Sequence, residues 1–331
     1  MLEDSNGTIW IGTEGGGLNM LTKADNRNQY SNFINLKTVL KPFALEEVLN
    51  YNGKKTLLIG AENSPGLFQL DISNPNKIKD SDIEPVNEIE YSVFSILQDS
   101  NLNLWIGTYN GGINRWLWNP STETYTKDTL TYLKTYNNGI SSNIIRNIYE
   151  DNKGSIWFAT ANGLCRLLKD EIYKKQPEFN IYKTIANDKK SLSHNYILAL
   201  HQSSNGSFWV GTFGGGLNKF DETSETFRAY TELDGLPNDV IKGILEDDNG
   251  NLWLSTNNGL SRFNPETETF KNYDVNDGLQ SNEFQELTCL KLDNGEFLFG
   301  GVNGFNAFYP ENIEDNTYKA KSVLTNFFIS N

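Results

Sequence analysis

The sequence predicts an all-β protein, a seven-bladed β-propeller whose blades are four-stranded antiparallel sheets. Three observations predict this fold. One segment recurs along the 331 residues, each complete copy contains four strand candidates, and the composition favours short strands joined by turns. Runs of Ala, Leu, Glu and Lys that favour helices are scarce, whereas Asn, Gly, Thr, Tyr and Phe are abundant.

The repeated segment is clearest at residues 150–164, where a strand, a tight turn, a second strand and a glycine-bearing turn follow one another. Five copies have a Trp at the centre of the second strand, and two looser copies have a Leu there. The seven central residues are Trp10, Leu58, Trp105, Trp157, Trp209, Trp253 and Leu298. A spacing of roughly 45 to 50 residues indicates a repeat architecture. Length alone would suggest two domains, but a single closed ring fits repeats of this size better.

Four strands are best seen in the repeat that spans residues 235–273. We expect them at 239–246, 252–256, 260–264 and 269–273, separated by turns of Asp, Asn, Gly and Pro. Four antiparallel strands repeated radially form a propeller, because blades stacked face to face bury surfaces that an isolated sheet would leave in water. Seven such units predict up to about 28 strands.

The Trp of the second strand is interpreted as the main buried residue of its blade. A ring of that size can cover both neighbouring sheets, so truncation to Ala should cost about 3 to 5 kcal/mol. The alternative, a platform for a ligand, is less favoured. Trp116 takes the place of Phe220 and Phe263 and is also interpreted as packing.

The two ends of the chain and two long connections depart from the repeat. Residues 23–35 and 74–88 are polar or charged and are predicted to be loops on the rim or a face. The propeller is predicted to span residues 1–312, and residues 313–331 either close the ring or begin a following module. The first strand of the first repeat is cut at Met1, which suggests a fragment of a longer protein. We therefore expect one strand to be missing or to be supplied by residues 323–329.

Composition excludes several functional classes. The net charge of −14 provides no basic surface for nucleic acid or for an anionic membrane. No apolar window approaches 18 residues and no leader pattern is present, so we expect no direct membrane insertion. Cys165 and Cys289 lie in predicted strands of different repeats and look like small core residues, although pairing remains an alternative.

Motifs that resemble chemical sites have simpler interpretations. Asp247, Asn249 and Asn251 have the spacing of a calcium loop, but Asn258 stands where a bidentate Glu is needed, so we interpret them as a turn. His194 and His201 are the only histidines and are poorly placed for zinc. Triple-glycine runs lack the context of a phosphate loop. No pair of carboxylates stands out for glycoside hydrolysis, so we expect no catalytic residues, no metal and no cofactor.

The pattern Glu-Asp-x-x-Gly-x-Leu/Ile-Trp-x-x-Thr-x-x-Gly-Leu resembles the two-component regulator propeller repeat, and it covers nearly the entire chain. The resemblance implies the periplasmic sensor region of hybrid histidine kinase/response regulators. In that family the blades are followed by an immunoglobulin-like module and a membrane helix, and residues 322–329 are similar to the first strand of that module. The resemblance also implies detection of glycans. Upstream blades, a signal peptide, a membrane helix and a kinase are not recognised in these residues, so we expect signalling itself to reside outside them.

Ligand specificity is sought where the repeats differ, because recurring residues hold the scaffold. The turn after each Trp strand and the loop before each first strand are predicted to share one face, opposite the Asp-x-x-Gly turns. Amides, carboxylates and exposed aromatic rings there suit a sugar. An ordinary set of solvated loops is the alternative for most of them. The candidate ligand-binding residues are Glu14, Tyr109, Asn143, His194, Asn195, Phe213, Asn238 and Asp239.

Two of these candidates carry the hypothesis. Tyr109 and Phe213 follow a Gly-Thr pair where other repeats have Glu14, Ala161 or Asn257. A core position would be apolar in every copy, so we expect one or both rings to be exposed near the mouth of the propeller and to stack on a sugar.

The sequence thus predicts a non-catalytic sensor propeller that binds an oligosaccharide or other small molecule. Its expected partners are upstream blades and the immunoglobulin-like module of the same receptor, with a homodimer as a further possibility. A propeller glycoside hydrolase or lyase, and a protein-interaction scaffold, are the alternatives.

Overall fold

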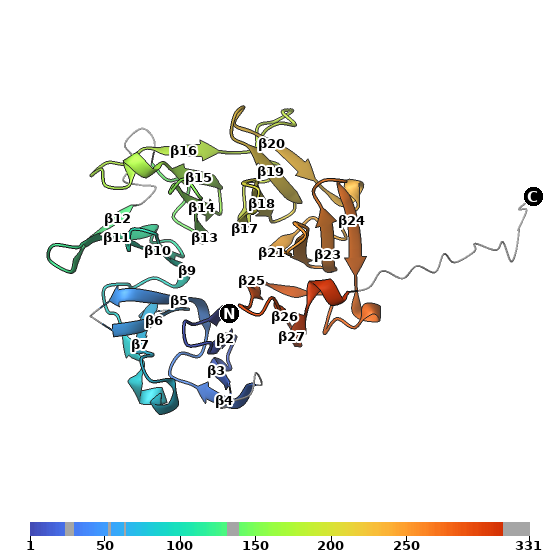
Figure 1. The fold of residues 1–331 in the computed structure, drawn as a ribbon. Helices are drawn as coiled ribbons and strands as arrows, with labels where there is room; N and C mark the ends of the chain where they lie inside the picture. Colours follow the sequence, from blue (N-terminus) through green and yellow to red (C-terminus); the bar gives the residue numbers. More distant parts are fainter. Residues whose placement is uncertain (24–29, 52–53, 63, 131–138, 314–331) are drawn as a thin grey trace, which may run out of the picture.

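A computed structural model of the chain describes residues 1–23, 30–51, 54–62, 64–130 and 139–313. In these ranges the chain forms seven antiparallel sheets arranged as blades around a central channel (Figure 1). Blades 1 to 6 have four strands each, and blade 7 has three among the described residues. The predicted all-β, seven-bladed β-propeller is confirmed.

Within each blade the strands follow one another as a simple meander. Blades 1 and 2 contain β1 (Leu2–Glu3), β2 (Ile9–Thr13), β3 (Gly17–Lys23), β4 (Tyr30–Leu36), β5 (Pro42–Tyr51), β6 (Lys54–Ala61), β7 (Leu67–Asp71) and β8 (Glu84–Pro85). Blades 3 and 4 contain β9 (Val93–Gln98), β10 (Leu104–Thr108), β11 (Ile113–Asn119), β12 (Thr124–Leu130), β13 (Ile145–Glu150), β14 (Ile156–Thr160), β15 (Gly163–Leu167) and β16 (Phe179–Tyr182).

Blades 5 to 7 continue in the same way. They contain β17 (Ile197–Gln202), β18 (Phe208–Thr212), β19 (Leu217–Asp221), β20 (Thr226–Tyr230), β21 (Ile241–Glu246), β22 (Leu252–Thr256), β23 (Gly259–Asn264), β24 (Thr269–Tyr273), β25 (Phe284–Lys291), β26 (Phe297–Gly301) and β27 (Gly304–Phe308). Short 3-10 turns lie between strands at Pro75–Lys77, Asp80–Asp82, Lys169–Glu171, Glu232–Asp234, Val275–Asp277 and Pro310–Asn312. No helix in the described part of the chain is long and apolar enough to cross a membrane.

The predicted strands of the sixth repeat agree closely with β21 to β24. The loop predicted at 23–35 is wrong for residues 30–35, which belong to β4 and pair with β3. A polar segment can form this strand because β4 lies at the edge of its sheet, where Asn35 is exposed. The connection at 74–88 contains two 3-10 turns and the short strand β8.

The structural interpretation of the Trp residues is confirmed. All five central Trp side chains are buried. In blades 1, 3, 4 and 6 the indole Nε1 donates to the Oδ2 of the turn aspartate at 2.8 to 2.9 Å. The Oδ1 of Asp151 accepts the backbone N–H groups of Lys153 and Ser155. Each aspartate therefore fixes its turn and orients the ring that packs between blades.

Hydrogen bonds join neighbouring blades at both ends of the channel. On one face, which we call the glycine-turn face, the glycine after the second-strand turn donates to the loop carbonyl before the next blade. Gly163 N donates to Asn195 O at 2.6 Å, for example. On the opposite, aspartate-turn face, Ser100 N and Oγ donate to the carboxylate of Glu150 in the following blade. The predicted separation of the two kinds of turn onto opposite faces is confirmed.

The ring closes between blades 7 and 1. The backbone N–H of Asp293 donates to Glu3 Oε2 at 2.8 Å. Ile9 of blade 1 packs with Leu292 and Leu298 of blade 7. The closing strand predicted at 323–329 lies outside the described residues.

Both cysteines are unpaired. Cys165 is buried, and Cys289 is partly buried in β25. Burial raises the pKa of both thiols, that of Cys289 to about 11. Their interpretation as small packing residues is confirmed.

Candidate functional site

The first strand of blades 2 to 6 carries a β-bulge at an equivalent place, near its start. One residue of the strand is left without a partner in the neighbouring strand, and a bulge of this kind changes the direction of that side chain. The five unpaired residues are Phe43, Phe94, Arg146, Leu198 and Lys242. The side chain at this position therefore varies between blades, as Phe in blades 2 and 3, Arg in blade 4, Leu in blade 5 and Lys in blade 6.

Phe43, Phe94 and Arg146 line one cavity of about 710 Å3. Residues of blades 1 and 7 complete its wall, among them Thr13, Glu14 and Phe305. The cavity therefore lies at the mouth of the channel rather than within a single blade. Its volume lies in the range usual for pockets that hold small molecules.

Aromatic rings form a contact chain at this mouth. Phe43 stacks on Phe94, with ring centroids 4.8 Å apart, and Phe94 contacts Tyr109 at 5.7 Å. The guanidinium of Arg146 lies 4.5 Å from the Phe94 ring centroid. A second aromatic pair, Tyr196 and Phe213, has centroids 5.6 Å apart.

Arg146 forms an ion pair with Glu286 of blade 7. Blades 4 and 7 are not neighbours in the ring, so the two side chains meet across the channel. Glu286 reaches this place because residues 285–288 of β25 lie opposite Gly300 alone, a far larger bulge than in the other blades. Leu287 within it has a positive φ of 56°. The Nε of Arg146 is buried and has no hydrogen-bond partner in the part of the chain that the structure describes.

Burial raises the pKa of Tyr196. Arg146 opposes this shift, whereas Glu286 and Tyr109 add to it, which shows that the four groups share one electrostatic environment. The phenol is thus neutral at physiological pH and can donate or accept a hydrogen bond. We call the following residues the mouth cluster: Phe43, Phe94, Tyr109, Arg146, Tyr196, Phe213 and Glu286.

Two of the predicted site residues belong to the mouth cluster. Tyr109 is 44% exposed and Phe213 is 47% exposed. Each ring contacts a less exposed aromatic neighbour, so part of its surface packs and part stays open to solvent. Glu14 lines the 710 Å3 cavity, of whose lining Tyr109 and Phe213 are not part, and its carboxylate lies 3.8 Å from Lys41 Nζ.

Three other predicted residues serve the junctions between blades through their backbone. The carbonyls of Asn143, Asn195 and Asp239 accept the N–H groups of glycines in the preceding blade. The side chain of Asn195 accepts Thr184 N at 2.8 Å, and that of Asp239 accepts Glu232 N at 2.7 Å. Partial burial raises the pKa of Asp239, an effect that the bond from Glu232 opposes.

The last two predicted residues shape the loops that lead into first strands. His194 Nδ1 accepts the backbone N–H of Tyr196 at 3.1 Å, which ties it to the mouth cluster. Asn238 Oδ1 accepts Val240 N at 3.0 Å. The ligand-binding role of all eight residues stays a prediction.

Phe43, Phe94, Arg146, Tyr196 and Glu286 were not among the site residues predicted from the sequence. Phe43, Phe94 and Arg146 share one signal, which is variation at the start of the first strand, where Phe, Arg, Leu, Lys and Gln replace one another between repeats. That variation was sought only in the loops. Glu286 had no signal, because the long bulge of β25 is not visible in the repeat pattern.

The turn interpretation of Asp247 is confirmed, because its Oδ1 accepts the backbone N–H groups of Asn249 and Asn251. No group of three or more His, Cys, Asp or Glu side chains that could hold a metal occurs in the described ranges. His201 Nε2 lies 3.2 Å from Glu246 Oε2, and burial lowers the pKa of His201. That histidine is a satisfied residue of the sheet, as predicted.

Comparison with known proteins agrees with the resemblance noted from the repeats. The model of the two-component regulator propeller matches residues 1–15, 139–162, 191–214 and 235–258. Histidine kinase P4 of Formosa agariphila is 30% identical over 98% of this chain. The chain spans only 23% of the length of that kinase.

Solved structures share the fold. Virginiamycin B lyase of Staphylococcus aureus superimposes with a TM-score of 0.63 at 14% identity, covering 92% of each chain. PorZ, a surface component of the type-IX secretion system of Porphyromonas gingivalis, gives 0.60 at 16%, covering 91% of this chain and 45% of its own. The extracellular domain of a proposed hybrid two-component system of B. thetaiotaomicron gives 0.41 at 21%, covering 94% and 56%. At these identities the likeness concerns the fold alone.

Proposed function

We propose that this chain, whose repeats are two-component regulator propeller repeats, is the ligand-sensing propeller of a hybrid two-component receptor. It binds a saccharide at the glycine-turn face and passes the signal to a kinase outside the chain. Support comes from the matched repeats and from the similarity to a histidine kinase.

The observation that carries the ligand-binding part of the proposal is the mouth cluster. Phe43, Phe94, Arg146 and Glu286 of this cluster line a cavity of about 710 Å3. The exposed ring of Tyr109 contacts Phe94 of this lining, and Tyr196, which contacts Phe213, shares the electrostatic environment of Arg146 and Glu286. These side chains come from five blades, and the bulge position is not constant around the ring, since it holds Phe43, Phe94, Arg146, Leu198 and Lys242 in blades 2 to 6. A scaffold role alone would not require such differences, because the same packing problem recurs in every blade.

A saccharide fits this chemistry better than a purely apolar ligand. The apolar face of a pyranose stacks on rings such as Tyr109 and Phe213, and its hydroxyls need paired donors and acceptors. The guanidinium of Arg146 supplies donors, Glu286 supplies acceptors, and the neutral Tyr196 phenol supplies both. The loop residues His194 and Asn195 lie beside this cluster in the sequence.

The remaining parts of the proposal concern the surroundings of the propeller. Residues 1–312 form the sensing domain, and residues 313–331 lead into the next module or close the ring. The receptor places this domain in the periplasm, next to further blades of the same receptor, and two copies associate in signalling.

Binding without turnover separates this proposal from its enzymatic alternative. A fold shared with virginiamycin B lyase makes a lyase or hydrolase the main rival. Incubation of the chain with an oligosaccharide panel should leave every compound intact by mass spectrometry. Product formation that the mutation of Glu286 abolishes would establish an enzyme instead.

The test of the site is Phe213→Ala, measured by calorimetry on oligosaccharides that bind the unaltered chain. We expect affinity to fall by about 1 to 2 kcal/mol, the scale of lost apolar contact with a ring-sized ligand. The free energy of unfolding should change by no more than about 0.5 kcal/mol, since the ring is half exposed.

The matched control is Tyr173→Ala. Tyr173 is 58% exposed and lies on the aspartate-turn face, where its hydroxyl accepts from Asn103 Nδ2 at 3.2 Å. This variant should keep full ligand affinity. A strongly destabilised Phe213→Ala chain with unchanged affinity would return Phe213 to the core. A chain that binds no saccharide but associates stably with itself would favour the interaction scaffold.

A further inference from the structure

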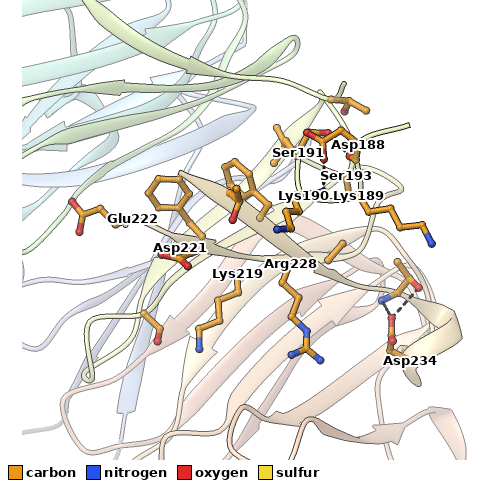
Figure 2. Close-up of a pocket in the computed structure, with 18 of the residues that line it drawn as sticks. Asp188, Lys189, Lys190, Ser191, Ser193, Lys219, Asp221, Glu222, Arg228 and Asp234 are labelled. Atoms are coloured by element: carbon orange, nitrogen blue, oxygen red, sulfur yellow. Dashed lines mark hydrogen bonds between the residues drawn. The ribbon is translucent and has the colours of Figure 1, made fainter. Parts of the chain in front are cut away.

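A second cavity lies away from the mouth, on the outer part of blade 5. This outer groove has a volume of about 1160 Å3 and is lined by β19, β20 and the loop before β17. Figure 2 shows Lys219 and Arg228 projecting side by side from neighbouring strands, with Lys189 and Lys190 on the loop. The backbone N–H of Phe227 donates to the carbonyl of Lys190, which holds this loop against the edge of β20.

The position of Lys219 can be compared between blades. In blades 3 to 6 the residue paired with the central Trp, on the third strand, is a cation: Arg115, Arg166, Lys219 and Arg262. Arg115 forms an ion pair with Asp128. Arg166 lies 3.2 Å from the turn aspartate Asp151 and 2.8 Å from Glu222.

Blade 5 keeps the cation but has lost the carboxylate. Ser203 replaces the turn aspartate, and Trp209 Nε1 donates to its hydroxyl at 3.0 Å. Lys219 Nζ lies 5.4 Å from the Trp209 ring centroid. No carboxylate of the described chain lies within ion-pair distance of Lys219, Lys189 or Lys190.

A second cation stands directly opposite Lys219. Arg228 is its partner in the register of β19 and β20, and like charges at such a pair are destabilising. Arg228 is bound by Glu268 of blade 6. Glu268 balances the charge of Arg228 only, so Lys219 keeps an uncompensated positive charge in the open groove.

The groove also contains four carboxylates, so its formal charges balance. Those carboxylates are already engaged locally. Asp188 accepts Lys190 N at 2.9 Å, Asp221 accepts Thr223 N at 2.9 Å, and Asp234 accepts Thr231 N at 2.8 Å. Glu222 is paired with Lys153 and Arg166 of blade 4. The hydrogen-bonding capacity left for a ligand belongs mainly to the cations.

We infer that the outer groove binds an oxyanion, a sulfate or carboxylate group, at Lys219 and Arg228. The bound group supplies the negative charge that Asp151 supplies in blade 4. The hydroxyl groups of Ser191, Ser193 and Thr226 also line the groove, but each already bonds within the protein, so the cations remain the main groups for a ligand. This site is independent of the mouth cluster, so either proposal can fail without the other.

The experiment titrates the whole chain with sodium sulfate at constant ionic strength, with glucose 6-sulfate, and with glucose. Binding is followed by calorimetry. We expect both sulfates to bind and glucose not to bind in this groove. Tighter binding of glucose 6-sulfate identifies a saccharide-borne group, whereas equal affinities identify the free ion, and both results support the oxyanion site.

Two variants locate the binding. Lys219→Gln should weaken sulfate binding by at least about fivefold, because it removes a charge-assisted contact. Ser203→Asp restores the carboxylate found in blades 1, 3, 4 and 6 and should weaken binding by a similar factor while keeping the fold. Lys271→Gln is the matched control, since it removes the same charge from the equivalent outer strand of blade 6. Absence of sulfate binding, or an equal loss in Lys271→Gln, would overturn the proposal.

Discussion

Blade 4 and blade 7 show two ways of building the same unit. Blade 4 has the turn aspartate Asp151, the buried Trp157 and a single-residue bulge at Arg146. Blade 7 has Leu292 at the place of the aspartate and Leu298 at the place of the Trp. Its first strand leaves residues 285–288 opposite one glycine, and three strands are described instead of four.

The difference separates scaffold from site. The regular blade holds Arg146 in a fixed frame of hydrogen bonds and aromatic contacts. The irregular blade gives up those contacts, and its long bulge carries Glu286 across the channel to Arg146. A repeat protein can thus reserve one loosely built unit for a functional side chain, because the neighbouring blades supply the stability of the ring.

The test with the largest expected effect replaces the central side chain of blade 4, and separately that of blade 7, by Ala. Trp157 stacks on Phe208 with centroids 4.3 Å apart, so Trp157→Ala should lower the free energy of unfolding by about 4 kcal/mol. Leu298→Ala should cost only about 2.5 kcal/mol. Denaturant unfolding monitored by circular dichroism measures both. Equal costs would show that blade 7 is as tightly built as blade 4.

The next test removes the turn aspartate. Asp151→Ala leaves the indole N–H of Trp157 and two backbone N–H groups without their acceptor, and Arg166 keeps only its pair with Glu222, so we expect a loss of about 3 kcal/mol. Ser203→Ala removes only one such acceptor in blade 5 and should cost about 1 kcal/mol. A similar loss at both sites would mean that the turn, and not its carboxylate, supplies the stability.

The pH dependence of stability tests a carboxyl group in blade 2, which, like blade 7, has no Trp at its centre. Glu46 of β5 is partly buried and accepts Gln98 N at 3.0 Å, and burial raises its pKa from an ordinary 4.5 to about 7. Below pH 4.5 the group is protonated in both folded and unfolded chains and costs nothing. Between pH 4.5 and about 7 the unfolded chain loses this proton while the folded chain keeps it, so the penalty grows across that window and is complete above about pH 7.

Glu46→Gln should therefore stabilise the chain by about 2 kcal/mol at pH 8, after allowance for partial exposure, and by nothing at pH 4. Melting temperatures of the two chains between these pH values give the comparison. A constant difference across the range would show that the carboxyl is not held in its neutral form.

The test with the smallest expected effect concerns a strained turn that blades 3 and 5 share. Glu123 and Glu225 occupy equivalent positions in it, and both have a positive φ of 51°. Glu225 accepts the hydroxyl of Tyr182 from blade 4 at 3.1 Å, whereas the side chain of Glu123 is exposed. Glu123→Gly should stabilise the chain by up to about 1 kcal/mol because glycine relieves the strain. Glu225→Gly should be near neutral, because it also loses the contact with Tyr182; equal gains would show that this contact contributes nothing.

The fold could be predicted because its causes are local and repeated. The turn aspartate, the Trp and the glycine turn act within one blade, so their spacing is visible in the sequence. The residues of the candidate site are brought together by the closed ring, across sequence separations such as the 140 positions between Arg146 and Glu286. Tyr109 and Phe213 were found because they break the repeat pattern within a turn. Phe43, Phe94 and Arg146 lie at bulges, whose register depends on strand pairing that the sequence alone does not specify.

The hydrogen bond between Asp293 and Glu3 joins residues 290 positions apart, yet it has the same chemistry as the bonds between consecutive blades. A linear array of repeats has two end units that can fray independently. The closed ring has no end unit, because every blade is covered by two others. Loss of this one contact region would expose the apolar faces of blades 1 and 7, including Ile9 and Leu298, together. Opening of the junction between blades 7 and 1 therefore weakens the packing of the whole ring. The other six junctions depend on this one, so the ring is expected to unfold cooperatively.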